Sequence, residues 1–218
     1  MDSHTLAILN ILLGTSMVSA LALLGTTRLR TCARVLAGQG LAVGLLPALM
    51  SDEQFTIRIV VLMVGNIVLK AVVFPWLLLR VCRDVSVRRD PGAFIGTGAA
   101  VLVGVLCLGI AAWLGTMVGA SLPSHPAGVY IVAFFLILTG LLLIIVRRRA
   151  VMQVMGYLTL ENGIYLFGSC AVIGVPFLLE FGVLLDVFAA IFVMGAALRQ
   201  IHAQFSSDDA TKLSELSG

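Results

Sequence analysis

The sequence carries little charge and lacks the residue spacings of metal, phosphate and redox sites. Of its 218 residues only 11% are charged and 60% are hydrophobic, whereas soluble domains carry about a quarter charged residues. The four cysteines form no CxxC pair and the three histidines are scattered, which argues against iron–sulfur and structural zinc sites. No glycine-rich phosphate loop follows a strand. We therefore expect no redox, metal, cofactor-binding or catalytic site in this chain itself.

The hydrophobic residues are gathered into long runs that are apolar on every face. A helix needs roughly 20 such residues to cross about 30 Å of hydrocarbon, and transmembrane strands would instead alternate apolar and polar residues. The runs predict an all-α polytopic bundle of seven transmembrane helices, with the first helix retained rather than cleaved as a signal peptide. The expected spans are 5–27, 35–51, 55–79, 93–119, 126–146, 150–174 and 176–198.

The second span is the least regular, because glycines and Pro47 interrupt a short run. A six-span bundle with one re-entrant segment is the alternative, and seven spans are favoured. With seven spans, twelve of the fourteen Lys and Arg residues fall on one side. The positive-inside rule then places the N-terminus outside and the C-terminus in the cytoplasm. The twelve are Arg28, Arg30 and Arg34, then Arg80, Arg83, Arg88 and Arg89, then Arg147, Arg148 and Arg149, and finally Arg199 and Lys212.

Three charged residues lie deep inside the predicted spans: Lys70, Glu161 and Asp186. An isolated charge at a helix centre costs roughly 2.5–3.5 kcal/mol, so it normally faces a charged partner or water. At 1.5 Å rise per residue they lie roughly 15, 18 and 20 Å from the flanking cytoplasmic arginines. All three are therefore expected near the midplane of the bilayer. A tight turn joins the last two spans, which predicts that Glu161 and Asp186 stand on antiparallel neighbours.

Three ionisable groups at one level are suited to a proton relay, because burial disfavours the charged forms while opposite charges favour them. A static Lys–carboxylate pair that holds helices together is the alternative. Nearby polar residues favour a hydrophilic seam, and Pro75 is expected to leave the carbonyl of Ala71, next to Lys70, without its helical partner. The supporting residues are Tyr157, Tyr165 and Asn162 around Glu161, Asn66 one turn before Lys70, and Glu180 near the outer interface.

The residues of the predicted relay also carry a family resemblance. The segments GYLTLENG around Glu161, LLDVFAA around Asp186 and LKAVVFPWLL around Lys70 resemble hydrogenase-4 component E. This resemblance is strong from Gln153 onward and weak before about Val60. It implies a membrane subunit of a formate hydrogenlyase-type complex in a bacterial or archaeal inner membrane. It further implies antiporter-like membrane partners and a peripheral arm, of the nickel-iron hydrogenase or quinone-oxidoreductase type, that holds the nickel–iron and iron–sulfur centres.

The last three predicted spans are also similar to the K subunit of complex I, which has an intramembrane glutamate in each of its last two helices. Glu161 matches the first, and Asp186 matches the second with a side chain one methylene shorter. The resemblance divides the chain into residues 1–125, a K-like unit of residues 126–202 and a cytoplasmic tail of residues 203–218. No role for Lys70 follows from it, because the four N-terminal spans have no counterpart in that subunit.

Three classes of function are compatible with these features. The favoured class is a non-redox subunit that carries part of a proton-translocation or coupling path in a complex-I-like assembly. The second is a component of a multisubunit cation/proton antiporter or a free-standing transporter, although no repeat with paired broken helices is evident. The third is a membrane-embedded enzyme, which the scattered histidines disfavour.

Overall fold

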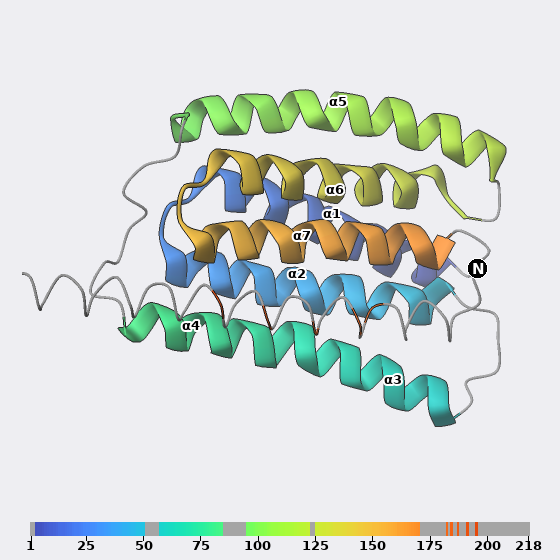
Figure 1. Ribbon diagram of the computed structural model, residues 1–218. Helices are drawn as coiled ribbons and strands as arrows, with labels where there is room; N and C mark the ends of the chain where they lie inside the picture. The colour runs from blue at the N-terminus through green and yellow to red at the C-terminus, as the bar shows by residue number, and fades with distance from the viewer. Residues whose placement is uncertain are drawn as a thin grey trace, which may run out of the picture.

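The computed structural model describes residues 3–50, 57–84, 95–122 and 125–170, with single positions at 182, 184, 187, 191 and 195. The elements in this part of the chain are helical, and the helices lie side by side along one common direction (Figure 1). They are α1 (Ser3–Gly25), α2 (Leu29–Met50), α3 (Ile57–Val68), the π-helix η1 (Leu69–Val73), α4 (Phe74–Asp84), α5 (Thr97–Ser121), α6 (Ala127–Val146) and α7 (Ala150–Cys170).

Four of the described helices are long and apolar enough to cross a membrane, namely α1, α2, α5 and α6. The predicted all-α fold is thereby confirmed for the described residues, while the count of seven spans and the orientation of the termini stay predictions. The 21-residue helix α7 is long enough to cross, but Gln153, Glu161 and Asn162 lower its hydropathy. The third predicted span is divided into α3, η1 and α4, so no single piece reaches the required length. The seventh, 176–198, falls almost wholly outside the described residues.

The second span is more regular than its sequence suggests. It forms the unbroken 22-residue helix α2, which also begins six residues earlier than the predicted start at residue 35. Arg30 and Arg34 were placed in a loop between spans, which is wrong: they lie in the first turns of α2. Arginines are good helix formers and their long stems reach the interface from within a helix.

The third predicted span is longer than expected and contains a local change of helix type. It runs from Ile57 to Asp84, so Arg80 is on the helix and not in the following loop. The segment Leu69–Val73 is a π-helix, in which the N–H of Phe74 bonds the carbonyl of Leu69 five residues earlier. Pro75 follows directly and has no N–H to give. The wide turn therefore re-pairs the backbone next to the proline.

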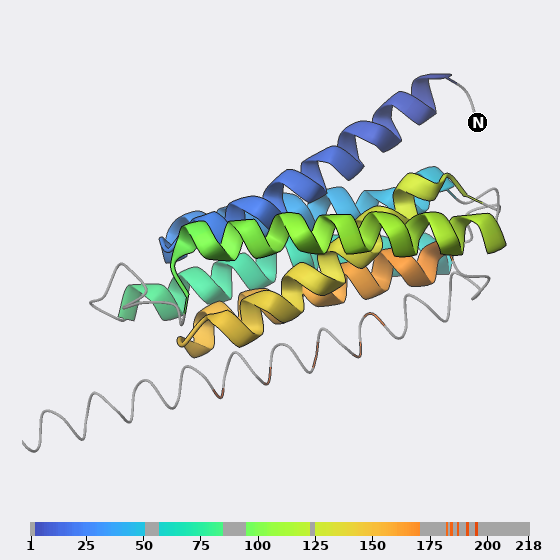
Figure 2. The same cartoon turned by 90° about the horizontal axis from the view of Figure 1, so that it is seen from above.

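The helices form layers around a central pair. Helices α6 and α7 pack most extensively, α5 covers α6 on one side, and α2 lies between α7 and the α3–α4 rod (Figure 1). Helix α1 crosses the bundle obliquely, so that its N-terminal half diverges from the other helices (Figure 2). Close approach of α6 and α7 depends on glycine: a Cβ on Gly163 would stand 2.7 Å from the carbonyl oxygen of Ala133. Small residues give the same close packing between membrane helices generally.

With α3, η1 and α4 taken as one rod, consecutive described helices run in opposite directions, so the arginine-rich segments gather at one end of the bundle (Figure 1). This basic end holds the α1–α2 connection with Arg28, the end of α4 with Arg80, and the α6–α7 connection with Arg147, Arg148 and Arg149. This gathering of basic residues at one end matches the positive-inside pattern. Large apolar side chains are exposed along the middle of α5, as expected for a helix that faces lipid or another subunit; they include Leu102, Leu106 and Trp113.

Candidate functional site: a buried lysine–glutamate pair

A layer of polar groups crosses the interior of the bundle sideways. It comprises the backbone carbonyl of Ser16 on α1, Gln39 on α2, Lys70 on η1, and Glu161 and Asn162 on α7, and we call these five residues the polar layer. All five are buried. Because they come from four helices, the layer exists only when those helices are packed together.

The centre of the polar layer is an ion pair. The Nζ atom of Lys70 lies 2.7 Å from Oε1 of Glu161, and both side chains are withdrawn from the surface, with 4% and 1% of their area exposed. The sequence-based depths of roughly 15 and 18 Å place the two residues at similar levels. Two opposite charges at this separation compensate much of the cost of burying each of them in hydrocarbon.

Amide side chains extend the layer from the ion pair to α1. Lys70 Nζ donates to Oδ1 of Asn162 at 3.2 Å, and Nδ2 of Asn162 donates to Oε1 of Gln39 at 3.4 Å. Nε2 of Gln39 in turn donates to the Ser16 carbonyl at 3.4 Å. Each bond polarises the next, so a change in charge at Lys70 or Glu161 is felt along the whole chain of bonds.

Lys70 is held by its backbone as well as by its ammonium group. It lies within the π-helix, and the ring of Tyr165 stands 5.0 Å from its Nζ, within cation–π range. A Cβ on Gly40 would stand 3.0 Å from Cβ of Lys70 and 3.1 Å from its carbonyl oxygen. Helix α2 therefore packs directly on the π turn, and a side chain at position 40 would require one of the two to shift.

Several buried polar atoms of the bundle have no hydrogen-bond partner within the described part of the chain. They are Oε2 of Glu161, both side-chain amide atoms of Asn66, and Oγ1 of Thr139. Buried polar atoms are almost always paired with protein or ordered water. These atoms thus mark positions at which internal water, or a proton on Glu161, would be stabilised.

The structure brings together some of the predicted site residues and leaves others apart. Lys70, Glu161, Asn162 and Tyr165 meet at one point, and Asn66 is buried one turn away on α3. Tyr157 is half-buried and packs against the apolar cluster near the basic end. Asp186 and Glu180 lie outside the described residues, so their roles stay predictions.

Sequence reasoning missed Gln39, although an amide within an apolar span was a visible signal. It also missed the special position of Arg147, which was grouped with its two neighbours as a topological charge. Arg147 is 1% exposed, whereas Arg148 is exposed. Its Nη2 donates to the carbonyls of Leu23, Leu24 and Thr26 at 3.2, 2.8 and 3.0 Å, so it caps the C-terminal end of α1.

Among the residues that the structure describes, no three histidine, cysteine, aspartate or glutamate side chains are grouped as metal ligands would be. The chemistry that these residues support is charge compensation and proton exchange. The ion pair supplies one acid–base couple, and the amides supply donors and acceptors that do not themselves ionise.

Comparison with known proteins identifies relatives that match most of the chain. It is 30% identical over 190 residues, 86% of each chain, to the uncharacterized protein Rv0085 of Mycobacterium tuberculosis. It is also 24% identical over 211 residues, 97% of this chain and 98% of the other, to hydrogenase-4 component E of Escherichia coli K12 and of Shigella flexneri.

No protein-family model matches the chain, and no solved structure matches it significantly. The similarity of residues 126–202 to the K subunit of complex I, and the division of the chain at residue 125, remain predictions from the sequence. The chain belongs to the family of the mycobacterial protein Rv0085 and is related over its whole length to hydrogenase-4 component E.

Proposed function

We propose that this protein is a non-redox membrane subunit of a hydrogenase-like, complex-I-like assembly, and that its polar layer forms part of an intramembrane proton path. Homology to hydrogenase-4 component E and the apolar helices fit such a subunit. The observation that carries the path is the buried Lys70–Glu161 pair, 2.7 Å apart in the interior of a membrane bundle.

The pair can exist in two protonation states that differ in how Lys70 is bonded. When Glu161 is ionised, Lys70 is shared between its carboxylate and Asn162. A proton added to Oε2 of Glu161, which has no hydrogen-bond partner among the described residues, neutralises the carboxyl and weakens its attraction for Lys70. Lys70 then depends on Asn162 and the ring of Tyr165, and loss of the proton restores the pair.

A purely structural pair is the competing explanation, and the surroundings of Glu161 favour the path. A pair that only holds helices together is most stable when each of its remaining polar atoms is satisfied by the protein. Here Oε2 of Glu161 and the amide of Asn66 are left without such partners among the described residues. A proton path requires sites for water next to a buried acid. A static cross-link does not require them.

The remaining expectations extend this proposal. The basic end faces the cytoplasm, and the protein resides in a bacterial or archaeal inner membrane. Its partners are antiporter-like membrane subunits and a peripheral arm, hydrogenase-like or quinone-oxidoreductase-like, that carries the nickel–iron and iron–sulfur centres. Asp186 is the second proton-binding carboxyl. No redox centre is assigned to this chain.

The decisive experiment measures coupling in the assembled complex. The tagged full-length chain is first recovered in mild detergent, and its partner subunits are identified by mass spectrometry. Glu161→Gln, which keeps an oxygen acceptor for Lys70 but cannot take up a proton, is then compared with the wild type for redox turnover and ion movement in liposomes. We expect turnover to continue while ion movement falls at least tenfold, with the subunits still assembled.

A matched double variant separates coupling from structure. Lys70→Met combined with Glu161→Gln removes both charges, so it should recover stability that Lys70→Met loses by leaving a buried carboxylate unpaired. It should not recover ion movement. Normal coupling in Glu161→Gln, or in the double variant, would contradict the proton path. Recovery of the chain without any partner would instead favour a free-standing transporter.

A further inference from the structure

Three arginines converge on one cavity at the basic end of the bundle, away from the polar layer. Arg30 and Arg34 of α2 and Arg80, Trp76 and Leu79 of α4 line a cavity of about 460 Å³, which we call the arginine pocket. The guanidinium carbon of Arg80 stands 5.5 Å from the centre of the Trp76 ring. All three arginine side chains are exposed.

The arginine pocket has a surplus of positive charge. Within the described part of the chain, no carboxylate pairs with Arg30, Arg34 or Arg80, and the ion pair found there joins Lys70 to Glu161. Three like charges around one cavity repel one another unless an anion lies between them. Guanidinium groups match phosphate oxygens in geometry as well as charge.

The arginine pocket lies at the level of lipid headgroups. Arg30 lies in the first turn of α2, and Arg80 lies four residues before the end of α4. Trp76 is one turn deeper than Arg80, and 56% of it is exposed. Tryptophans at this level commonly mark the boundary between headgroups and hydrocarbon. Basic pockets between transmembrane helices on the cytoplasmic side bind anionic headgroups in other membrane proteins.

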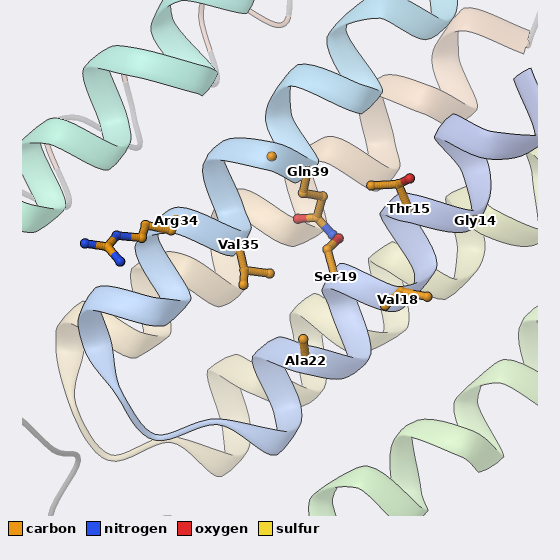
Figure 3. A pocket seen from close by; sticks show the side chains of 9 residues that line it. Gly14, Thr15, Val18, Ser19, Ala22, Arg34, Val35 and Gln39 are labelled. Atoms are coloured by element: carbon orange, nitrogen blue, oxygen red, sulfur yellow. The ribbon is translucent and has the colours of Figure 1, made fainter. Parts of the chain in front are cut away.

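An apolar groove begins where the arginine pocket ends. Arg34 also lines a second cavity of about 460 Å³ between α1 and α2, whose other lining residues include Gly14, Val18, Ala22, Val35 and Gly38 (Figure 3). In Figure 3, Arg34 extends away from α1, while Val18, Ala22 and Val35 lie along the groove.

The depth of this groove fits one leaflet. Gly14 is eleven residues from the end of α1 at Gly25, or roughly 16 Å along a helix. Half of the hydrocarbon thickness is about 15 Å. A free phosphate would use only the arginines, whereas a phospholipid would use the arginines and the groove together.

We propose that the arginine pocket and the adjoining α1–α2 groove form a binding site for an anionic phospholipid, with its phosphate among Arg30, Arg34 and Arg80 and an acyl chain along Gly14, Val18 and Gly38. The charge of three arginines fits a headgroup with two phosphodiesters better than a headgroup with one. The three arginines of this site are not part of the polar layer, and the groove reaches that layer at Gln39.

Native mass spectrometry of the full-length chain tests the proposal. The chain is delipidated in detergent and titrated with diphosphatidylglycerol, phosphatidylglycerol or phosphatidylcholine. We expect affinity to decrease in that order. Each single substitution Arg30→Gln, Arg34→Gln or Arg80→Gln should weaken diphosphatidylglycerol binding about fivefold, and the triple variant on the order of a hundredfold if the effects add. Arg28→Gln, an exposed arginine at the same end that does not line the pocket, should bind like the wild type.

A second variant tests the groove without changing charge. A Cβ on Gly38 would meet nothing within 4 Å, so Gly38→Leu should fold normally and fill the groove. We expect it to weaken lipid binding severalfold, while Gly109→Leu on α5, where the space is equally open, should have no effect. Equal binding by the triple variant and the wild type, or equal weakening by Arg28→Gln, would overturn the proposal. So would inorganic phosphate displacing the lipid at equal concentration.

Discussion

Gly40 of α2 lies directly against the backbone of Lys70: a Cβ at this glycine would stand 3.0 Å from Cβ and 3.1 Å from the carbonyl oxygen of the lysine. The neighbour is a helix backbone, which cannot rotate away as a long side chain can. The position of the ammonium group opposite Glu161 therefore depends on the absence of a side chain on another helix.

This relationship predicts the effect of adding a side chain. Gly40→Val should push η1 away from α2, lengthen the Lys70–Glu161 contact and destabilise the protein by about 1–3 kcal/mol, the usual cost of overpacking. The measurement is thermal unfolding in mild detergent, together with coupling in the assembled complex. Gly109→Val on α5 is the control, because its Cβ would meet nothing within 4 Å. Equal losses in both variants would show that a valine in a helix is itself destabilising, and the contact of Gly40 with Lys70 would then be unimportant.

The hydrogen bonds of Arg147 predict an effect on the stability of the protein. Arg147→Lys keeps the positive charge but replaces a planar fork by a single ammonium group, which cannot maintain the bonds to Leu23, Leu24 and Thr26. We expect a loss of about 2 kcal/mol in the free energy of unfolding, because carbonyls at the end of α1 lose their donor. Arg148→Lys, at an exposed side chain, should change it by no more than about 0.5 kcal/mol. Similar values for the two variants would contradict the capping role.

The direction of the bundle in the membrane can be measured by cysteine labelling. Arg148 at the basic end and Ser121 at the end of α5 are both exposed and lie at opposite ends of the bundle. In a cysteine-free background, we expect Arg148→Cys to react with an impermeant thiol reagent only in inside-out vesicles, and Ser121→Cys only in right-side-out vesicles. The reverse pattern would show that the basic end faces outward, against the positive-inside rule.

Asp186 and Glu180 should differ in their effects on coupling. Gly182 is buried, and a Cβ on it would stand 3.4 Å from the ring of Tyr165, while Leu184, Val187 and Ile191 are exposed. Asp186 is the predicted second proton-binding carboxyl, whereas Glu180 is predicted near the outer interface.

Asp186→Asn should therefore reduce ion movement as Glu161→Gln does, and Glu180→Gln should leave ion movement nearly unchanged. Both are measured in the same liposome assay. A silent Asp186→Asn would remove this residue from the path, and a strong effect of Glu180→Gln would place the outer mouth of the path at that residue.

How far the sequence predicts the site differs from residue to residue. The spacing of Lys70 and Glu161 from the flanking arginines was sufficient to place both at one depth, because helix rise is constant. It could not show that they touch, since the rotation of each helix depends on its neighbours. Gln39 does not stand out in the sequence, because an isolated amide costs less to bury than a charge, although it continues the hydrogen-bonded chain to Ser16.

Hydropathy and helix geometry are properties of the chain alone, so they were enough to predict a helical membrane protein with Lys70 and Glu161 in its interior. The tertiary structure was needed to show that these two charges meet, that a π turn beside Pro75 carries Lys70, and that Arg147 is buried and caps α1 while Arg148 is exposed. Such contacts join residues far apart in the chain. They are set by how closely the helices pack, and at Gly40 that depends on a missing side chain.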